Sequence, residues 1–137
     1  MNESLKMLIK KYETPGDFSY ARITKIQIKK YENQLKSRFP KQYTDFLLQY
    51  GHGGIGGIVI LGIGKDGSPI FLETTLEHRA DGLPHNFIVI ENCDEWLNCI
   101  DCLTGQIVSW APDFSQISFS EFDEYLLSRF QDAIENL

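Results

Sequence analysis

The 137-residue sequence has no apolar run long enough to cross a membrane, and its N-terminus (MNESLKMLIKK) has no hydrophobic signal core. Both absences predict a cytoplasmic protein that does not bind membranes. The chain has only three cysteines, Cys93, Cys99 and Cys102, which cannot all pair with one another. An odd, clustered set fits a reducing compartment better than a secreted disulfide scaffold. Without an internal repeat or a linker, the length predicts one domain over residues 1–137.

Basic residues are scarce after residue 50. Residues 1–50 carry ten Lys/Arg and five Asp/Glu, a net charge of +5, whereas residues 51–137 carry three and fourteen, a net charge of −11. The C-terminal part is therefore expected to repel nucleic acid and to attract basic surfaces. An acidic surface kept only for solubility is the alternative explanation.

Helical periodicity predicts four helices. Thr24 and Gln27 form a capping box ahead of the second helix, and Ser118 and Glu121 form another ahead of the last. Pro40 suits the first turn of the third. The predicted helices are Ser4–Tyr12, Lys25–Ser37, a segment from Pro40 with the apolar stripe Tyr43, Phe46, Leu47 and Tyr50, and a C-terminal helix over 122–134.

The pattern changes to short β-branched runs after Tyr50, which predict about five strands. Lys65–Gly67 and Leu103–Gly105 are the expected turns. Because no helical stretch separates the strands, the order predicts an α+β fold with N-terminal helices, a central, mainly antiparallel sheet of about five strands and a C-terminal helix. The predicted strands are Ile58–Leu61, Pro69–Leu72, Phe87–Glu91, Trp96–Asp101 and Gln106–Trp110.

Three glycines, Gly51, Gly53 and Gly56, spell the dinucleotide-binding pattern G-x-G-x-x-G. In that motif the glycines follow a strand and open a helix, whose N-terminal N–H groups hold the phosphates. Here a helical pattern precedes Gly51 and a strand pattern follows, so a phosphate would face the negative end of a helix. The interpretation is structural, with Gly51 in the left-handed conformation that ends the third helix.

Catalytic and metal-binding motifs are also missing. Cys99-x-x-Cys102 resembles half of a zinc site, with Cys93 as a third thiol and His85 as the nearest histidine, but no second pair of ligands follows. Neither G-x-S-x-G nor H-E-x-x-H occurs. The sequence therefore predicts no metal, no cofactor and no catalytic residue. A small thiol- or metal-dependent enzyme that uses these cysteines and a histidine remains an alternative.

Acidic and aromatic residues gather near the ends of the predicted strands. Trp96 and Trp110 each lie beside carboxylates, and aromatic side chains often anchor protein interfaces. The alternative for either tryptophan is a place in the core. The candidate partner-binding residues are Glu91, Asp94, Glu95, Trp96, Asp101, Trp110 and Asp113.

A series of short motifs resembles the SUKH superfamily. Glu32-x-x-Leu35 is followed by Phe39-Pro40-x-x-Tyr43-x-x-Phe46-Leu47 and then by a glycine turn, where family members have E-x-x-L and L-P-x-x-Y-x-x-F-L. Phe39 replaces the usual leucine. The segments Asn98–Val108 and Ser118–Phe122 are similar to the later hairpin and to the S-F-x-E-F helix start of the family.

The resemblance implies an α+β fold and, for most bacterial members, an immunity role without catalytic residues. Such proteins bind a secreted polymorphic toxin, often a nuclease. With the acidity of residues 51–137, the resemblance predicts an antitoxin that neutralises a cognate toxin with a basic nuclease domain by stoichiometric binding. The superfamily also includes fungal cell-wall synthesis regulators, so a non-catalytic regulator or scaffold is the alternative.

Overall fold

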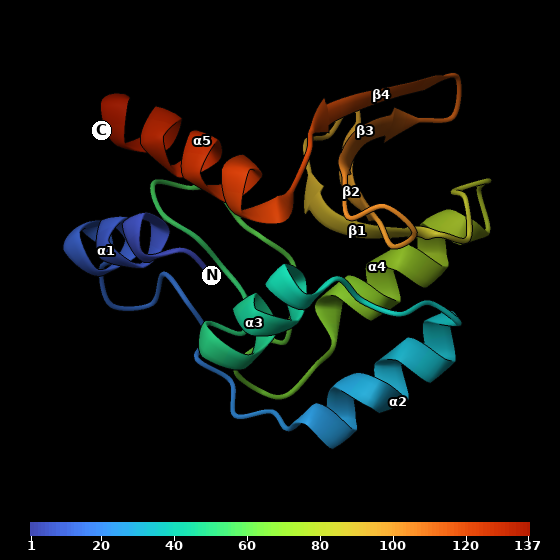
Figure 1. Ribbon diagram of the computed structural model, residues 1–137, viewed down its shortest axis with the longest axis horizontal. Coiled ribbons are helices and arrows are strands. Elements are labelled where there is room, and N and C mark those ends of the chain that lie inside the picture. The colour runs from blue at the N-terminus through green and yellow to red at the C-terminus, as the bar shows by residue number, and fades with distance from the viewer.

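The computed structural model describes residues 1–137 and contains five helices and one four-stranded antiparallel sheet. Four helices precede the sheet and one follows it (Figure 1). The α+β prediction is confirmed, with four strands rather than about five. The elements are α1 (Glu3–Tyr12), α2 (Lys25–Leu35), α3 (Lys41–Gln49), α4 (Ile70–Arg79), β1 (Phe87–Asn92), β2 (Leu97–Asp101), β3 (Ile107–Ala111), β4 (Phe114–Phe119) and α5 (Phe122–Glu135).

The capping box predicted for α2 is present. The Thr24 hydroxyl accepts from the Gln27 backbone N–H at 3.2 Å, and the Gln27 side-chain oxygen accepts from the Thr24 backbone N–H at 2.7 Å. These two bonds satisfy donors that a helix N-terminus leaves without partners. The helix ends at Lys36, which takes the left-handed conformation with φ of 54°.

Two predicted strands are wrong. The segment Ile58–Leu61 forms only an isolated bridge, between Gly53 and Ile60, and Pro69–Leu72 belongs to the start of α4. Pro69 occupies the N-cap position, where its missing N–H costs nothing, and Glu73 lies in the first turn, where the helix dipole favours an acid. The apolar run therefore forms the buried start of a helix. Periodicity alone cannot distinguish such a short helical segment from a buried strand.

The sequence prediction also misses β4 and misplaces the cap of α5. Ser118 lies in β4, where its hydroxyl is 2.7 Å from that of Ser109 on β3, so it cannot cap a helix. Glu121 is itself the N-cap residue and makes no side-chain capping bond. All of β4 is exposed or half-buried, which explains why it carries no buried-strand signal.

Tyr43 of α3 is fully buried in the hydrophobic core. Its ring packs edge-on against Phe71 of α4 at 5.7 Å and Phe122 of α5 at 5.5 Å between centroids. Its hydroxyl donates to the carbonyl of Leu61 at 2.7 Å, which satisfies the buried polar group. One side chain thus joins three helices to the segment that leads into the sheet.

The glycine segment follows α3 and allows close backbone contacts. Gly51 is left-handed, with φ of 77°, as predicted for the residue after the helix. Gly53 has φ of 117° and pairs with both Phe18 and Ile60, and a Cβ there would lie 2.0 Å from the Asp17 carbonyl oxygen. No helix begins until Ile70, so these glycines do not open a phosphate-binding helix.

We expect Gly53→Ala to lower the free energy of unfolding by about 3 kcal/mol, because it combines an unfavourable φ with a backbone clash. Gly57→Ala is the matched control. Gly57 also has a positive φ (87°), but a Cβ there meets nothing within 4 Å, so the cost should be about 1 kcal/mol. Urea unfolding measures the free energy of unfolding of both variants. Equal losses in the two would show that the close backbone contact at Gly53 does not add to the cost.

Candidate partner-binding surface

The sheet contains no positive charge. From Phe87 to Phe119 the chain has five Asp/Glu and no Lys, Arg or His. The ten Lys/Arg of residues 1–50 are concentrated on α1, α2 and their flanks, and in Figure 1 α2 and the sheet lie at opposite ends of the molecule. The charge asymmetry of the sequence is therefore also an asymmetry in space.

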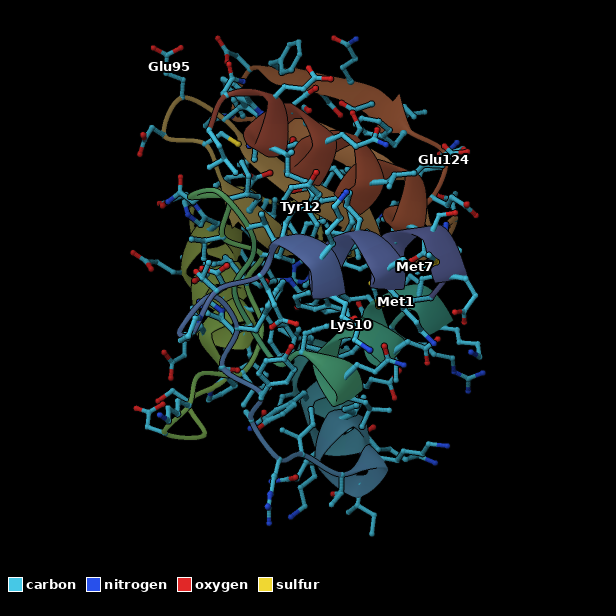
Figure 2. The ribbon with its side chains drawn as sticks, turned by 90° about the vertical axis from the view of Figure 1, so that its left-hand side faces the viewer. Met1, Met7, Lys10, Tyr12, Glu95 and Glu124 are labelled. Carbon is cyan, nitrogen blue, oxygen red and sulfur yellow. The ribbon has the colours of Figure 1, made fainter.

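The turn between β1 and β2 holds two of the predicted acids outward. The backbone N–H of Cys93 donates to the Trp96 carbonyl at 3.0 Å and closes the turn. Asp94 is left-handed, with φ of 67°, and its N–H donates to the Asn92 side chain at 2.9 Å. Asp94 and Glu95 are exposed, and Figure 2 shows Glu95 pointing away from the molecule at the end opposite to α2.

Four of the predicted residues share one groove of about 340 Å³. Its walls include Asp94, Glu95, Trp96 and Trp110 from the sheet, with His78 and Asp81 at the end of α4. Three carboxylates and the carbonyl end of a helix therefore surround two indole rings. Trp96 is 42% exposed and is therefore the accessible aromatic side chain. Trp110 is only 7% exposed and belongs to the hydrophobic core, the alternative considered for either tryptophan, so it forms the floor of the groove.

A second groove, of about 440 Å³, adjoins the first, and the two share Glu95, Trp96 and Ala111. Asp113, in the β3–β4 turn, and Phe114, at the start of β4, line this groove. Phe114 is 47% exposed. The structure thus brings together five of the seven predicted residues, and we call them, with Phe114, the Trp96 surface: Asp94, Glu95, Trp96, Trp110, Asp113 and Phe114.

Glu91, the sixth, is buried beneath this surface rather than part of it. Its carboxylate accepts from Arg129 and from the Tyr125 hydroxyl of α5, and also from Asn98 of β2 at 3.0 Å. Burial first, and then the Glu91 carboxylate, raise the pKa of Tyr125; hydrogen bonding to Glu91 raises the pKa of Arg129. Glu91 is only 4% exposed, so its carboxylate is not available to contact a partner.

The Glu91 network nevertheless supports the Trp96 surface. Asn98 gives its amide N–H to Glu91, and its carbonyl oxygen accepts from the Trp96 indole at 3.3 Å and from the Ser109 hydroxyl at 2.9 Å. A chain of polar contacts thus runs from Arg129 to the exposed tryptophan. These contacts hold the Trp96 indole in one orientation.

Asp101, the seventh, lies at the other end of β2. It accepts from the Asn86 side chain at 2.9 Å and from the Leu103 backbone N–H at 2.9 Å, so it organises the β2–β3 turn. The sequence prediction missed His78 and Asp81, which line the first groove, because their helix was not recognised. It missed Phe114 because β4 was not recognised either.

The cysteines are poor candidates for catalysis. Burial raises the pKa of the Cys93 thiol to about 11 and those of Cys99 and Cys102 to about 12. A nucleophilic cysteine needs the opposite shift. All three are free thiols, and no group of three or more His, Cys, Asp or Glu side chains is placed to hold a metal ion.

Comparison with known proteins identifies the family of the chain. Residues 1–131 match the model of SUKH_5, described as SMI1-KNR4 cell-wall. The chain belongs to the SUKH_5 family. A crystal structure of a protein from Pseudomonas syringae pv. tomato has the same fold as this SUKH_5 protein, with a TM-score of 0.67 and 19% identity over 94% of this chain and 96% of that one. In the SUKH_5 protein described here, none of the helices α1 to α5 is long and apolar enough to span a bilayer.

In this SUKH_5 protein, Glu91→Gln should lower the free energy of unfolding by about 2 kcal/mol. The variant leaves the Arg129 guanidinium without its counter-ion. The expected loss is smaller than for a fully buried ion pair, because the Arg129 side chain is 31% exposed and solvent screens its charge. Glu124→Gln is the control, since Glu124 is exposed and bonds only to the Ser120 hydroxyl. Denaturant unfolding gives both values, and an unchanged stability for Glu91→Gln would show that the ion pair contributes nothing.

The thiols should react slowly with iodoacetamide in the native protein. For Cys93, a pKa of about 11 in place of 9.0 lowers the thiolate fraction at pH 8 roughly a hundredfold. Because the folded pKa is raised, reactivity should rise about tenfold with each pH unit and level off only above about pH 11. Mass spectrometry of native and denatured samples measures the ratio, and rapid native labelling at pH 7 would restore the thiol-enzyme alternative.

Proposed function

We propose that this SUKH_5 protein is an immunity protein that binds and neutralises a cognate toxin by forming a stoichiometric complex. Membership of the family over residues 1–131 is the observation that carries this proposal, because SUKH proteins are typically non-catalytic immunity proteins with toxin partners. The raised pKa values of the three thiols support a binding role over a thiol enzyme.

The partner that fits best is a nuclease toxin with a basic substrate-binding surface. A nuclease must attract phosphates, so an acidic protein can cover the same surface. The support for this choice is the sheet without Lys or Arg, whose exposed acids flank Trp96. Electrostatic attraction would speed association, and the aromatic side chain would supply desolvated contact area.

Growth rescue tests the immunity function. A toxin gene should neighbour this gene, and co-expression should restore growth to cells that produce the toxin domain. The purified proteins should form a complex of fixed stoichiometry. If no neighbouring gene product is toxic, or if co-expression fails to rescue growth, the immunity proposal falls.

The charge contribution is tested with two double variants that change net charge equally. Asp94→Asn/Glu95→Gln should weaken toxin binding about tenfold, mainly through a slower association rate, and should flatten its salt dependence. Asn suits the left-handed conformation of residue 94. Asp132→Asn/Glu135→Gln, on exposed positions of α5, is the control. Equal effects in surface plasmon resonance would show that net charge, not the Trp96 surface, directs binding.

A further inference from the structure

The two edge strands of the sheet, β1 and β4, differ in whether other parts of the chain cover their outer backbone groups. The outer edge of β1 is closed, because the Leu61 N–H donates to the Ile90 carbonyl at 2.8 Å and the Val89 N–H donates to the Thr75 hydroxyl at 3.0 Å. The outer edge of β4 has no such cover. Its backbone forms hydrogen bonds with β3 alone.

The register of the β3–β4 hairpin identifies the open backbone groups. Ala111 pairs with Phe114 across a two-residue turn, so the N–H and C=O groups of Phe114 face β3. In an antiparallel pair, successive residues direct their backbone N–H and C=O groups to opposite sides of the strand. The backbone groups of Gln116 therefore face β3, and those of Ser115 and Ile117 face the open edge. Two residues therefore offer unpaired backbone donors and acceptors to a partner.

This edge also lacks the features that normally prevent pairing. The strand, FSQISF, contains no charge, proline or glycine, and all of it is exposed or half-buried. Phe114 and Ile117 are 47% and 59% exposed, on opposite faces of the strand. Natural proteins usually protect an edge strand with a lysine, a proline or a covering loop. An open, uncharged edge is suited to strand addition.

We propose that β4 accepts an extended basic segment of the toxin as a fifth strand, an inference that rests on the proposed immunity function. The charges around β4 select such a segment. Asp113 precedes the strand, Glu121 follows it, and Glu95 lines the groove on one face, whereas no Lys or Arg lies between residues 80 and 128. Lysines or arginines on the added strand would face these carboxylates, while its apolar side chains would pack beside Phe114 and Ile117.

A second copy of this chain fits the edge less well. In the antiparallel register that pairs the two Ile117 residues, Asp113 of each copy would face Glu121 of the other. Like charges opposite each other destabilise a strand pair. The same two acids that disfavour self-association therefore favour a basic partner.

The first test compares Ser115→Pro with Ser115→Ala, using as probe the catalytically inactivated toxin domain encoded beside this gene. Proline removes the outward N–H and obstructs a neighbouring strand, yet an edge position tolerates it within the fold. We expect Ser115→Pro to weaken binding at least about tenfold by calorimetry and Ser115→Ala to bind like the wild type. Thermal melting establishes that each variant is folded.

Hydrogen exchange on the wild-type complex gives a second readout that needs no variant. The amides of Ser115 and Ile117 should exchange fast in the free protein and at least tenfold more slowly when the toxin is bound. Those of Phe114 and Gln116, which already face β3, are the internal reference. Unchanged exchange at Ser115 and Ile117 in the complex would overturn strand addition.

The outcomes separate the two proposals. If the wild type rescues growth and binds the toxin while Ser115→Pro binds equally well, strand addition is wrong and the immunity function stands. If the wild type neither rescues nor binds, both are wrong. A dimer in light scattering, with Ser115 and Ile117 protected in the free protein, would show that a second copy occupies the edge and would also overturn the inference.

Discussion

The close approach of backbone segments around the glycines after α3 is the constraint on which the rest of this structure depends. Gly51, Gly53 and Gly62 allow the chain to pass against Asp17–Tyr20 and against itself, at distances that a Cβ would prevent. These contacts place Leu61 where its carbonyl accepts from Tyr43 and its N–H reaches β1. The helical half is thus joined to the sheet through backbone contacts that no larger residue would permit.

The segment around Leu61 also covers one edge of the sheet. Because Leu61 and Thr75 cover β1, that edge is internal to the molecule, and the sheet can extend only beyond β4. At the other end of the chain, Arg129 and Tyr125 of α5 bind Glu91 and tie β1 to that helix. The β1 side of the sheet is therefore tied to helices, while the β4 side and the turns beside it are open to solvent.

Local signals in the sequence predict most of the fold, and long-range contacts account for what they miss. The capping box at Thr24 and the strands of the β1–β3 region depend on neighbouring residues, so they can be read from the chain. The burial of Glu91 depends on Arg129, 38 residues away, and no local pattern reports it. Pro69–Leu72 is too short to distinguish a buried strand from a helix start, and the alternation of β4 is too weak because both of its faces are exposed. Acids beside tryptophans identified five residues that the structure brings together, whereas Glu91 and Asp101 lie outside that group, and a binding role for the five stays a prediction.

A sheet with five acids and no cation is unfavourable for the isolated protein, because its charges repel one another. Glu91 is the exception, since its charge is balanced by Arg129 from another element. Asp94, Glu95 and Asp113 are without such a counter-ion, and they lie beside exposed apolar side chains and an unprotected edge. Each of these features alone would weaken stability or solubility, and a basic, strand-forming partner would relieve all of them at once. Their concentration at one end of the molecule therefore supports the proposal that this end binds a basic partner.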